Sequence, residues 1–371
     1  MSISRVKISN ISEKNKYLYF TLENCPLCYA NGIRRIILSE IPCIVFKYDS
    51  ENINIIDNKS RMNNEVIKQR IASIPIHISD IDNFSYNDYI VELEKVNDTN
   101  NIIYVTTADL KIKNKKLNTY ISDLEVKKIF PPNEITSDYI DILRLRPKLS
   151  NNMEVEKLKF TANLEVSNAN IDGMYNVVST CSYGNTKDLV AINSEWEKKE
   201  KELKVKNLSK EEINIIKNDW ILLDAKRLFI KNSYDFVIET IGIYENFKII
   251  EMAGNIIIKK IVKFIEDIKL DHSLIKDATD TLINCYIILL KNEDHTLGKI
   301  VEYALFIKYF QERKELNYVG FLKKHPHDND SFIKISFKSV MSKDDIILML
   351  EDSLNDSIVS LKSISDYFSE K

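Results

Sequence analysis

The C-terminal stretch 344–368 constrains the fold most, because an apolar or small residue recurs there every three or four positions. The repeat consists of Ile347, Leu350, Leu354, Ser357, Leu361, Ile364 and Phe368. This spacing places one stripe along a helix, as in a coiled-coil seam, and such a stripe needs a partner surface. A helix predicted over residues 248–269 offers one, with apolar residues on several sides. We expect the two helices to pack together.

Length and charge limit the class of protein. The 371 residues favour two or three domains, and 44% hydrophobic with 29% charged residues is ordinary for a globular protein. Proteins that grip duplex DNA directly are usually basic, whereas this chain has a net charge of −3. No apolar run approaches the roughly 18–20 residues that span a bilayer. The five cysteines are scattered, which favours a reducing compartment over a disulfide framework.

The chain divides into segments of different character. A β-hairpin is predicted over residues 6–22, followed by a helix over 24–41 that Asn24 caps and Pro42 ends, and a short strand over 43–46. Residues 47–190 alternate polar loops with strand-like runs, which indicates an inserted β-rich domain. A strand over 234–242 precedes the helix 248–269. From residue 275, strand 283–290, helix 296–313, strand 332–337 and helix 344–368 form a further unit.

Residues 191–231 form a charged helical linker, and residues 195–206 are nearly all Glu and Lys. A solvated helix is the simpler interpretation of such a run. The alternative is that this stretch covers a neighbouring subunit.

Two separated motifs carry a family resemblance. Residues 31–42, from Asn31-Gly32 through Arg34-Arg35 to Glu40-Ile41-Pro42, resemble the first-helix pattern N-(A/G)-(L/I)-R-R-x-x-L-x-E-(V/I)-P. That pattern is found in the third-largest subunit of eukaryotic RNA polymerase II, its archaeal equivalent and the bacterial α N-terminal domain. Residues 293–298, Glu-Asp-His-Thr-Leu-Gly, resemble the E-D-H-T-L-G-N motif of the eleventh subunit, with Lys299 where Asn is usual.

Further matches support this resemblance. Arg70 to Ile76 resembles the third-subunit pattern R-(L/I)-(G/A)-x-I-P-(L/I), and Val105 to Leu110 resembles its V-(T/S)-S-x-D-L strand. The run from Tyr234 to Gly242 resembles the strand that returns to the dimerisation domain, and Val319 to Pro326 resembles an eleventh-subunit turn.

The resemblance implies an α+β fold in which two RNA polymerase α-like dimerisation modules pack within one chain. The third-subunit-like module would be 1–46 plus 232–270, and the eleventh-subunit-like module 271–371. The inserted β-rich domain 47–190 and the linker 191–231 would lie between them in sequence. The chain would be a non-catalytic assembly platform that docks the two largest polymerase subunits.

The resemblance also implies residue roles. The subunit-interface residues would be Asn31, Gly32, Arg34, Arg35, Glu40, Arg70 and Pro75. The intramolecular dimerisation residues would be Ile257, Ile261, Phe264, Asp294, His295, Leu297, Gly298, Leu350, Leu354 and Leu361. For the Arg34–Arg35 pair, the alternative is a solvated helix face. Arginine suits docking because its planar fork bonds carboxylates and backbone oxygens bidentately.

The implied partners are the largest and second-largest polymerase subunits, with small subunits resembling the tenth and twelfth. DNA would be reached only indirectly through the complex, and no membrane is expected. Because cells keep the two α-like subunits on separate chains, the fusion resembles large cytoplasmic DNA viruses. We therefore expect a location in the virion and host cytoplasm.

Candidate catalytic and metal sites have simpler explanations. Cys25-Pro26-Leu27-Cys28 lacks the second cysteine pair of a structural zinc site. Related subunits hold a zinc or iron–sulfur cluster with several cysteines in the inserted domain, where this chain has only Cys181. Asp294 and Thr296 suit helix capping, with His295 packing locally. His325-Pro326-His327 is a weak metal motif. We expect no metal, cofactor or catalytic residues, since a polymerase centre needs clustered aspartates for Mg²⁺.

Two other functions compete with the platform. An enzyme could use His295, His325 and His327, and would need a metal or a hydrolase-like pocket around them. A free-standing interaction module outside transcription would purify without large polymerase subunits.

Overall fold

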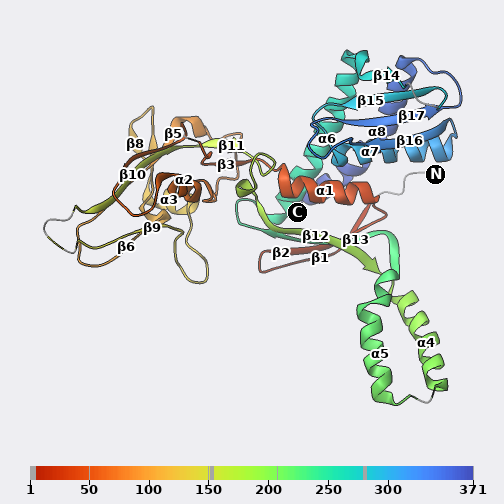
Figure 1. Ribbon diagram of the computed structural model, residues 1–371, viewed down its shortest axis with the longest axis horizontal. Helices are drawn as coiled ribbons and strands as arrows, with labels where there is room; N and C mark the ends of the chain where they lie inside the picture. The colour runs from red at the N-terminus through yellow and green to blue at the C-terminus, as the bar shows by residue number, and fades with distance from the viewer. Residues whose placement is uncertain are drawn as a thin grey trace. The chain divides into compact units, whose positions relative to one another are not determined.

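The protein is described by a computed structural model covering residues 6–370 except 50, 149, 151–153, 207 and 279–281 (Figure 1). It is a mixed α and β structure that divides into two compact units. The first unit combines the described residues of Met1–Ile36, Thr180–Glu239 and Asn246–Lys371. The second combines those of Ile37–Ser179 and Thr240–Glu245. The predicted inserted domain, 47–190, overlaps the second unit without sharing its bounds.

The first unit contains two four-stranded sheets. The strand order of one is β1-β2-β13-β12, and that of the other is β14-β15-β17-β16. The first sheet consists of β1 (Lys7–Lys14), β2 (Tyr17–Glu23), β12 (Val178–Lys187) and β13 (Phe229–Thr240). The second consists of β14 (Ile275–Asp277), β15 (Cys285–Leu290), β16 (Leu316–Leu322) and β17 (Ser331–Phe337). The predicted N-terminal hairpin is confirmed as the antiparallel pair β1–β2.

Two long helices, α6 (Asn246–Leu270) and α8 (Lys343–Ser369), form the packed pair expected from their apolar stripes. All seven residues of the C-terminal repeat are buried. The helices approach closely at Gly254, where an added Cβ would lie 2.1 Å from the Ser365 Oγ and 3.6 Å from the Leu361 carbonyl oxygen. Small residues at this point let the two backbones come together.

Helix α1 (Leu27–Ser39) begins three residues later than the cap predicted at Asn24. Asn24 instead has a left-handed backbone, with φ of 54°. The carbonyl of Pro26 accepts the backbone N–H groups of Tyr29 and Ala30, so Pro26 occupies the capping position. Proline costs little there because the first helical N–H groups have no partner within the helix. The short strand after the helix is confirmed as β3 (Cys43–Val45).

The helix predicted over 296–313 is α7 (His295–Leu305) continued by a π-helix, η6 (Phe306–Glu312). In this segment the Arg313 N–H bonds the Lys308 carbonyl at 3.0 Å, which is an i to i+5 spacing. The Lys308 ammonium pairs with Asp352 and Asp356 of α8, each at 2.8 Å. The Tyr309 hydroxyl donates to Asp352. The apolar periodicity of the sequence cannot reveal this π-helix, because it is stabilised by bonds to Asp352 and Asp356 on another helix, α8.

The charged stretch is helical, as predicted, but it forms a hairpin of two helices, α4 (Leu189–Val205) and α5 (Lys210–Leu222) (Figure 1). A separate small core joins them, with the rings of Trp196 and Trp220 centred 5.5 Å apart and Leu203 and Ile213 buried beside them. Ser209 begins α5 with a capping box. The short helix η4 (Asp224–Arg227) follows.

The second unit is rich in β-structure, with one extended apolar core. Its five-stranded sheet has the order β4-β10-β5-β7-β8, and two-stranded pairs β11–β3 and β6–β9 accompany it. The sheet strands are β4 (Ile53–Asn58), β5 (Tyr89–Asn97), β7 (Lys111–Asn114), β8 (Thr119–Tyr120) and β10 (Glu156–Asn163). Besides β3, the unit also contains β6 (Ile103–Thr106), β9 (Asp141–Leu145), β11 (Glu165–Ser167), α2 (Asn64–Ala72), α3 (Asp123–Ile129) and the short helices η1 (Tyr86–Asp88), η2 (Thr107–Asp109) and η3 (Gly173–Tyr175). None of the described helices is long and apolar enough to cross a membrane.

Candidate assembly interface

Gly32 lies where helices α1, α6 and α7 meet in the first unit. A Cβ added to Gly32 would lie 3.5 Å from Ile300, 3.6 Å from Ile257 and 3.9 Å from Thr296. The glycine therefore sits at ordinary contact distance from two other helices, and a longer side chain would push them away. An alanine would fit at this position, and only a larger side chain would separate α1 from α6 and α7.

Arg35 joins the two sequence motifs directly. Its Nε donates to the Thr296 hydroxyl at 2.8 Å, and its Nη2 bonds and pairs with the Asp294 carboxylate. One guanidinium thus holds two neighbouring oxygens at the start of α7. The fork geometry of arginine suits this arrangement, because two of its N–H groups point at two neighbouring oxygens.

Asp294 also caps α7, since its carboxylate accepts the Thr296 N–H at 2.8 Å. The predicted capping role of this segment is therefore confirmed. Partial burial raises the pKa of Asp294, but the Thr296 N–H and the Arg35 charge outweigh it, so the pKa is lowered overall. The carboxylate stays ionised at the positive end of the helix dipole.

Arg34 is held differently from Arg35. Its Nε and Nη2 donate to the Asn31 side-chain oxygen, one turn back on the same helix, at 3.2 and 3.0 Å. Within the described part of the chain its guanidinium hydrogen-bonds only to Asn31. Of the two adjacent arginines, Arg35 bonds Asp294 and Thr296 near the start of another helix. Arg34 bonds only Asn31 in the described part of the chain, so some of its N–H groups can still donate to a partner.

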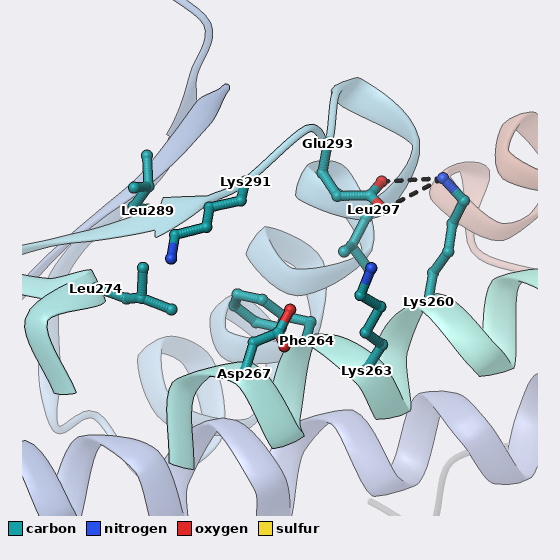
Figure 2. Close-up of a pocket in the computed structure, with 9 residues that line it drawn as sticks. All are labelled: Lys260, Lys263, Phe264, Asp267, Leu274, Leu289, Lys291, Glu293 and Leu297. Carbon is teal, nitrogen blue, oxygen red and sulfur yellow. Dashed lines mark hydrogen bonds and ion pairs between the residues drawn. The ribbon is translucent and has the colours of Figure 1, made fainter. Parts of the chain in front are cut away.

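A second ion pair crosses between α6 and the residues before α7. The Lys260 ammonium lies 3.2 Å from both Glu293 carboxylate oxygens, and both side chains are about four-fifths buried. Figure 2 shows this pair at a small pocket of about 30 Å³, lined also by Lys263, Phe264 and Leu297. The Arg35 contact therefore ties α1, and the Lys260 contact ties α6, to the segment that begins α7.

The predicted dimerisation residues gather in the same unit. His295 packs edge-on against Phe321, with ring centres 4.8 Å apart, and Gly298 lies under the same ring. The Tyr29 hydroxyl of α1 donates to the Ser357 hydroxyl of α8 at 2.9 Å. The following predicted residues are all buried there: Ile257, Ile261, Phe264, Leu297, Gly298, Leu350, Leu354 and Leu361.

Three predicted interface residues belong to the second unit. Arg70, on α2, donates from Nε to the Ile142 carbonyl and from Nη2 to the Asp141 carbonyl, both at 2.6 Å. These bonds tie α2 to β9, so its donors serve the fold of this unit. Pro75 and Glu40 are half-buried.

The cysteines and histidines form no metal cluster among the residues that the structure describes. Burial raises the pKa values of Cys25, Cys43 and Cys181 to about 12 and also raises the pKa of Cys28, so these thiols stay protonated at neutral pH. Cys181 lies on β12 in the first unit.

Sequence reasoning missed Lys260 and Ser357, and missed Glu293 and Thr296 as partners of other helices. Glu293 and Thr296 belong to the recognised motif, but their partners lie 33 and 261 positions away. A single sequence contains no signal that pairs residues so far apart.

Known proteins similar to this chain include polymerase subunits. No family model matches it. It is 23% identical over 285 residues to the DNA-directed RNA polymerase subunit Rpo3 of Pyrococcus furiosus, covering 71% of this chain and 97% of the relative. It is 37% identical over 81 residues to the RPB3 subunit of RNA polymerase II of Schizosaccharomyces pombe, covering 22% of this chain and 25% of the relative.

A conjugation stage-specific protein of Tetrahymena thermophila is 33% identical over 104 residues, or 25% of this chain and 32% of the relative. The chain thus spans about a third of that relative and about half of a second Rpo3 subunit, from Pyrococcus horikoshii. The chain is therefore similar to the Rpo3 and RPB3 subunits of DNA-directed RNA polymerase.

Proposed function

We propose that this chain is the non-catalytic assembly platform of a DNA-directed RNA polymerase and carries both α-like partners on one polypeptide. The third-subunit-like module is 1–46 plus 232–270, and the eleventh-subunit-like module is 271–371. The inserted β-rich domain is 47–190, and the linker is 191–231.

The observation that carries this proposal is the contact between the two motifs. Arg35, from the Arg-Arg motif on α1, bonds Asp294 and Thr296 of the motif that begins α7. Gly32 brings α1 against α6 and α7 at the same place. In this proposal the third-subunit-like and eleventh-subunit-like modules meet at this contact within one molecule.

Docking of the second-largest subunit would use Asn31, Arg34, Glu40 and Pro75, while Arg70 would support this face by holding α2 against β9. The second module would face the largest subunit. Arg34 is the strongest candidate because its guanidinium retains unused donors beside α1. Small subunits resembling the tenth and twelfth would complete the platform. The fusion favours a viral polymerase in the virion and host cytoplasm.

The contacts of Asp294 and His295 fit a role without catalysis. Asp294 caps a helix and pairs with Arg35, which gives its carboxylate a structural role, and the exposed His295 packs against Phe321. The nucleotidyl transfer would take place on the partner subunits.

The test is affinity purification of the tagged full chain from its native source, with quantitative mass spectrometry. We expect the two largest polymerase subunits at about one copy each per chain. An Arg34→Glu variant should lose the second-largest subunit yet remain folded, because among the described residues Arg34 bonds only Asn31 of its own helix. Lys248→Glu is the matched control, since Lys248 is exposed and its ion pair in the described part of the chain is with Glu251 on its own helix. Recovery of the tagged chain alone would refute the polymerase assignment.

A further inference from the structure

The α4–α5 hairpin has an apolar core of its own. Along α4, whose 17 residues the structure describes in full, the buried side chains are Trp196 and Leu203. Along α5 they are Ile213 and Trp220. The short helix η4 completes this core, and every described residue that belongs to it lies within 192–228. The hairpin is therefore held together by its own side chains.

The two tryptophans join the helices from both sides. Lys199 of α4 lies over the Trp220 ring of α5, with 5.9 Å between the ammonium and the ring centre. Lys217 of α5 lies over the Trp196 ring of α4, with a distance of 5.6 Å. A cation over an aromatic face is attracted by the ring, and the two rings also pack on each other. Each of these contacts requires both helices to be in place.

The polar contacts of the hairpin also stay within it. Asp188 caps α4 and Ser209 caps α5. The ion pairs of the hairpin are Lys198–Glu195, Lys199–Asp224, Lys204–Glu200 and Arg227–Asp224. Within the described part of 188–228, no side-chain hydrogen bond or ion pair reaches a residue outside that range. At the base, the Asp188 N–H bonds the Leu228 carbonyl at 3.1 Å and closes the hairpin.

The two helices depend on each other but not on the rest of the first unit. Isolated helices of this length are marginal in water, because the first turn is costly to form. α4 and α5 have 17 and 13 residues, so losing their contact should release both together. α6 and α8, by contrast, carry buried side chains along their whole length. Segments with few buried apolar contacts open at a lower free energy than the main core.

We propose that the α4–α5 hairpin is a separately folding arm, which opens and closes as one cooperative unit while the sheets and long helices of the first unit stay folded. Opening exposes both indole rings and breaks the crossed lysine contacts. It leaves the contact between Arg35 and Asp294 intact, because no described hairpin residue bonds to α1 or α7. The order of the arm can therefore change without unfolding the first unit.

The experiment is native-state hydrogen exchange of the purified full chain, read by mass spectrometry in low concentrations of urea. Four forms are compared: wild type, Trp220→Ala in the hairpin, Leu354→Ala in α8, and the control Val205→Ala. Val205 lies on α4 with its side chain 82% exposed. Exchange rates are measured separately for peptides from α4 and α5 and for peptides from α6 and α8.

We expect the wild-type hairpin amides to exchange at least about tenfold faster than those of α6 and α8. Trp220→Ala should accelerate exchange in the hairpin at least about tenfold further, because it removes one ring of the pair, and should leave α6 and α8 unchanged. Leu354→Ala should accelerate exchange in α6 and α8 and leave the hairpin unchanged. Val205→Ala should change neither.

Equal acceleration of the hairpin and of α6 by Trp220→Ala would overturn the proposal, because the two would then unfold as one unit. An unchanged hairpin in Trp220→Ala, or an accelerated one in Leu354→Ala, would overturn it as well. A hairpin left without protection in Trp220→Ala, beside a protected α6 and α8, would support it. The milder Ser209→Ala removes the cap of α5 and should then accelerate hairpin exchange roughly fivefold, again without effect on α6.

Discussion

At the scale of single residues, two adjacent arginines have different surroundings. Arg35 reaches across to Asp294 and Thr296, whereas Arg34 bonds Asn31 on its own helix. The sequence motif predicts a role for both arginines. It does not show that Arg35 makes an internal contact with α7 while Arg34 bonds only within α1 among the described residues.

Replacing Asp294 with Asn should remove a pH-dependent part of the stability. The pKa of Asp294 is lowered in the folded protein, so its contribution is present above the ordinary value of about 3.9 and is lost as the pH falls through the lowered value. Asn caps helices as well as Asp does, so the variant removes the charge and keeps the cap.

The measurement is the urea midpoint of both proteins by circular dichroism, from about pH 6 to about pH 2. The wild type should be the more stable form at the upper end, and the difference should vanish at the lower end. A difference that stays constant with pH would contradict this assignment.

Gly298→Ala should destabilise the first unit, because the new Cβ would fall 2.0 Å from a Phe321 ring carbon. Overpacking of this kind costs about 1–3 kcal/mol, of which helix propensity returns roughly 1 kcal/mol. Gly184→Ala is the control, since nothing lies within 4 Å of its added Cβ. Urea unfolding of the two variants should differ. Equal urea midpoints for the two variants would mean that the Phe321 ring shifts to accommodate the new methyl group without loss of stability.

At the scale of elements, apolar periodicity predicted the long helices and the N-terminal hairpin. Helices α6 and α8 end within two residues of the predicted bounds, because each carries a continuous stripe. The sequence did not reveal the start of α1 or the π-helix, since Pro26 and Lys308 act through backbone and cross-helix bonds. The Arg35–Asp294 contact was likewise unpredictable, although each half belongs to a recognised motif.

Leu354→Ala should cost about 2–5 kcal/mol, because Leu354 is fully buried in the seam of α8. Leu348→Ala on the same helix is the matched control, with Leu348 61% exposed, and should change the free energy of unfolding by less than about 0.5 kcal/mol. Chemical denaturation compares the two. Similar losses from both would mean that the seam is not the main packing surface of the helix.

At the scale of the whole molecule, only a short segment separates the proposed modules. α6 ends at Leu270 and β14 begins at Ile275. A short connection raises the effective concentration of joined partners to roughly millimolar. Association of the α-like pair would then not depend on how much protein is present.

The melting temperature of the intact chain should stay constant over a roughly hundredfold dilution. A version cut after Leu270, with the two pieces mixed, should lose stability on the same dilution, because association becomes bimolecular. Calorimetry or circular dichroism measures both. A melting temperature of the intact chain that falls on dilution would reveal assembly between chains instead.

The paired indole rings of the hairpin give the protein an internal optical reporter. The chain has two tryptophans, Trp196 and Trp220, and both lie in the small core that joins α4 to α5. Emission excited at the red edge of protein absorption therefore originates from this hairpin alone, whatever happens in the two sheets. A spectral shift when a polymerase subunit is added would record an event at the hairpin without any attached dye.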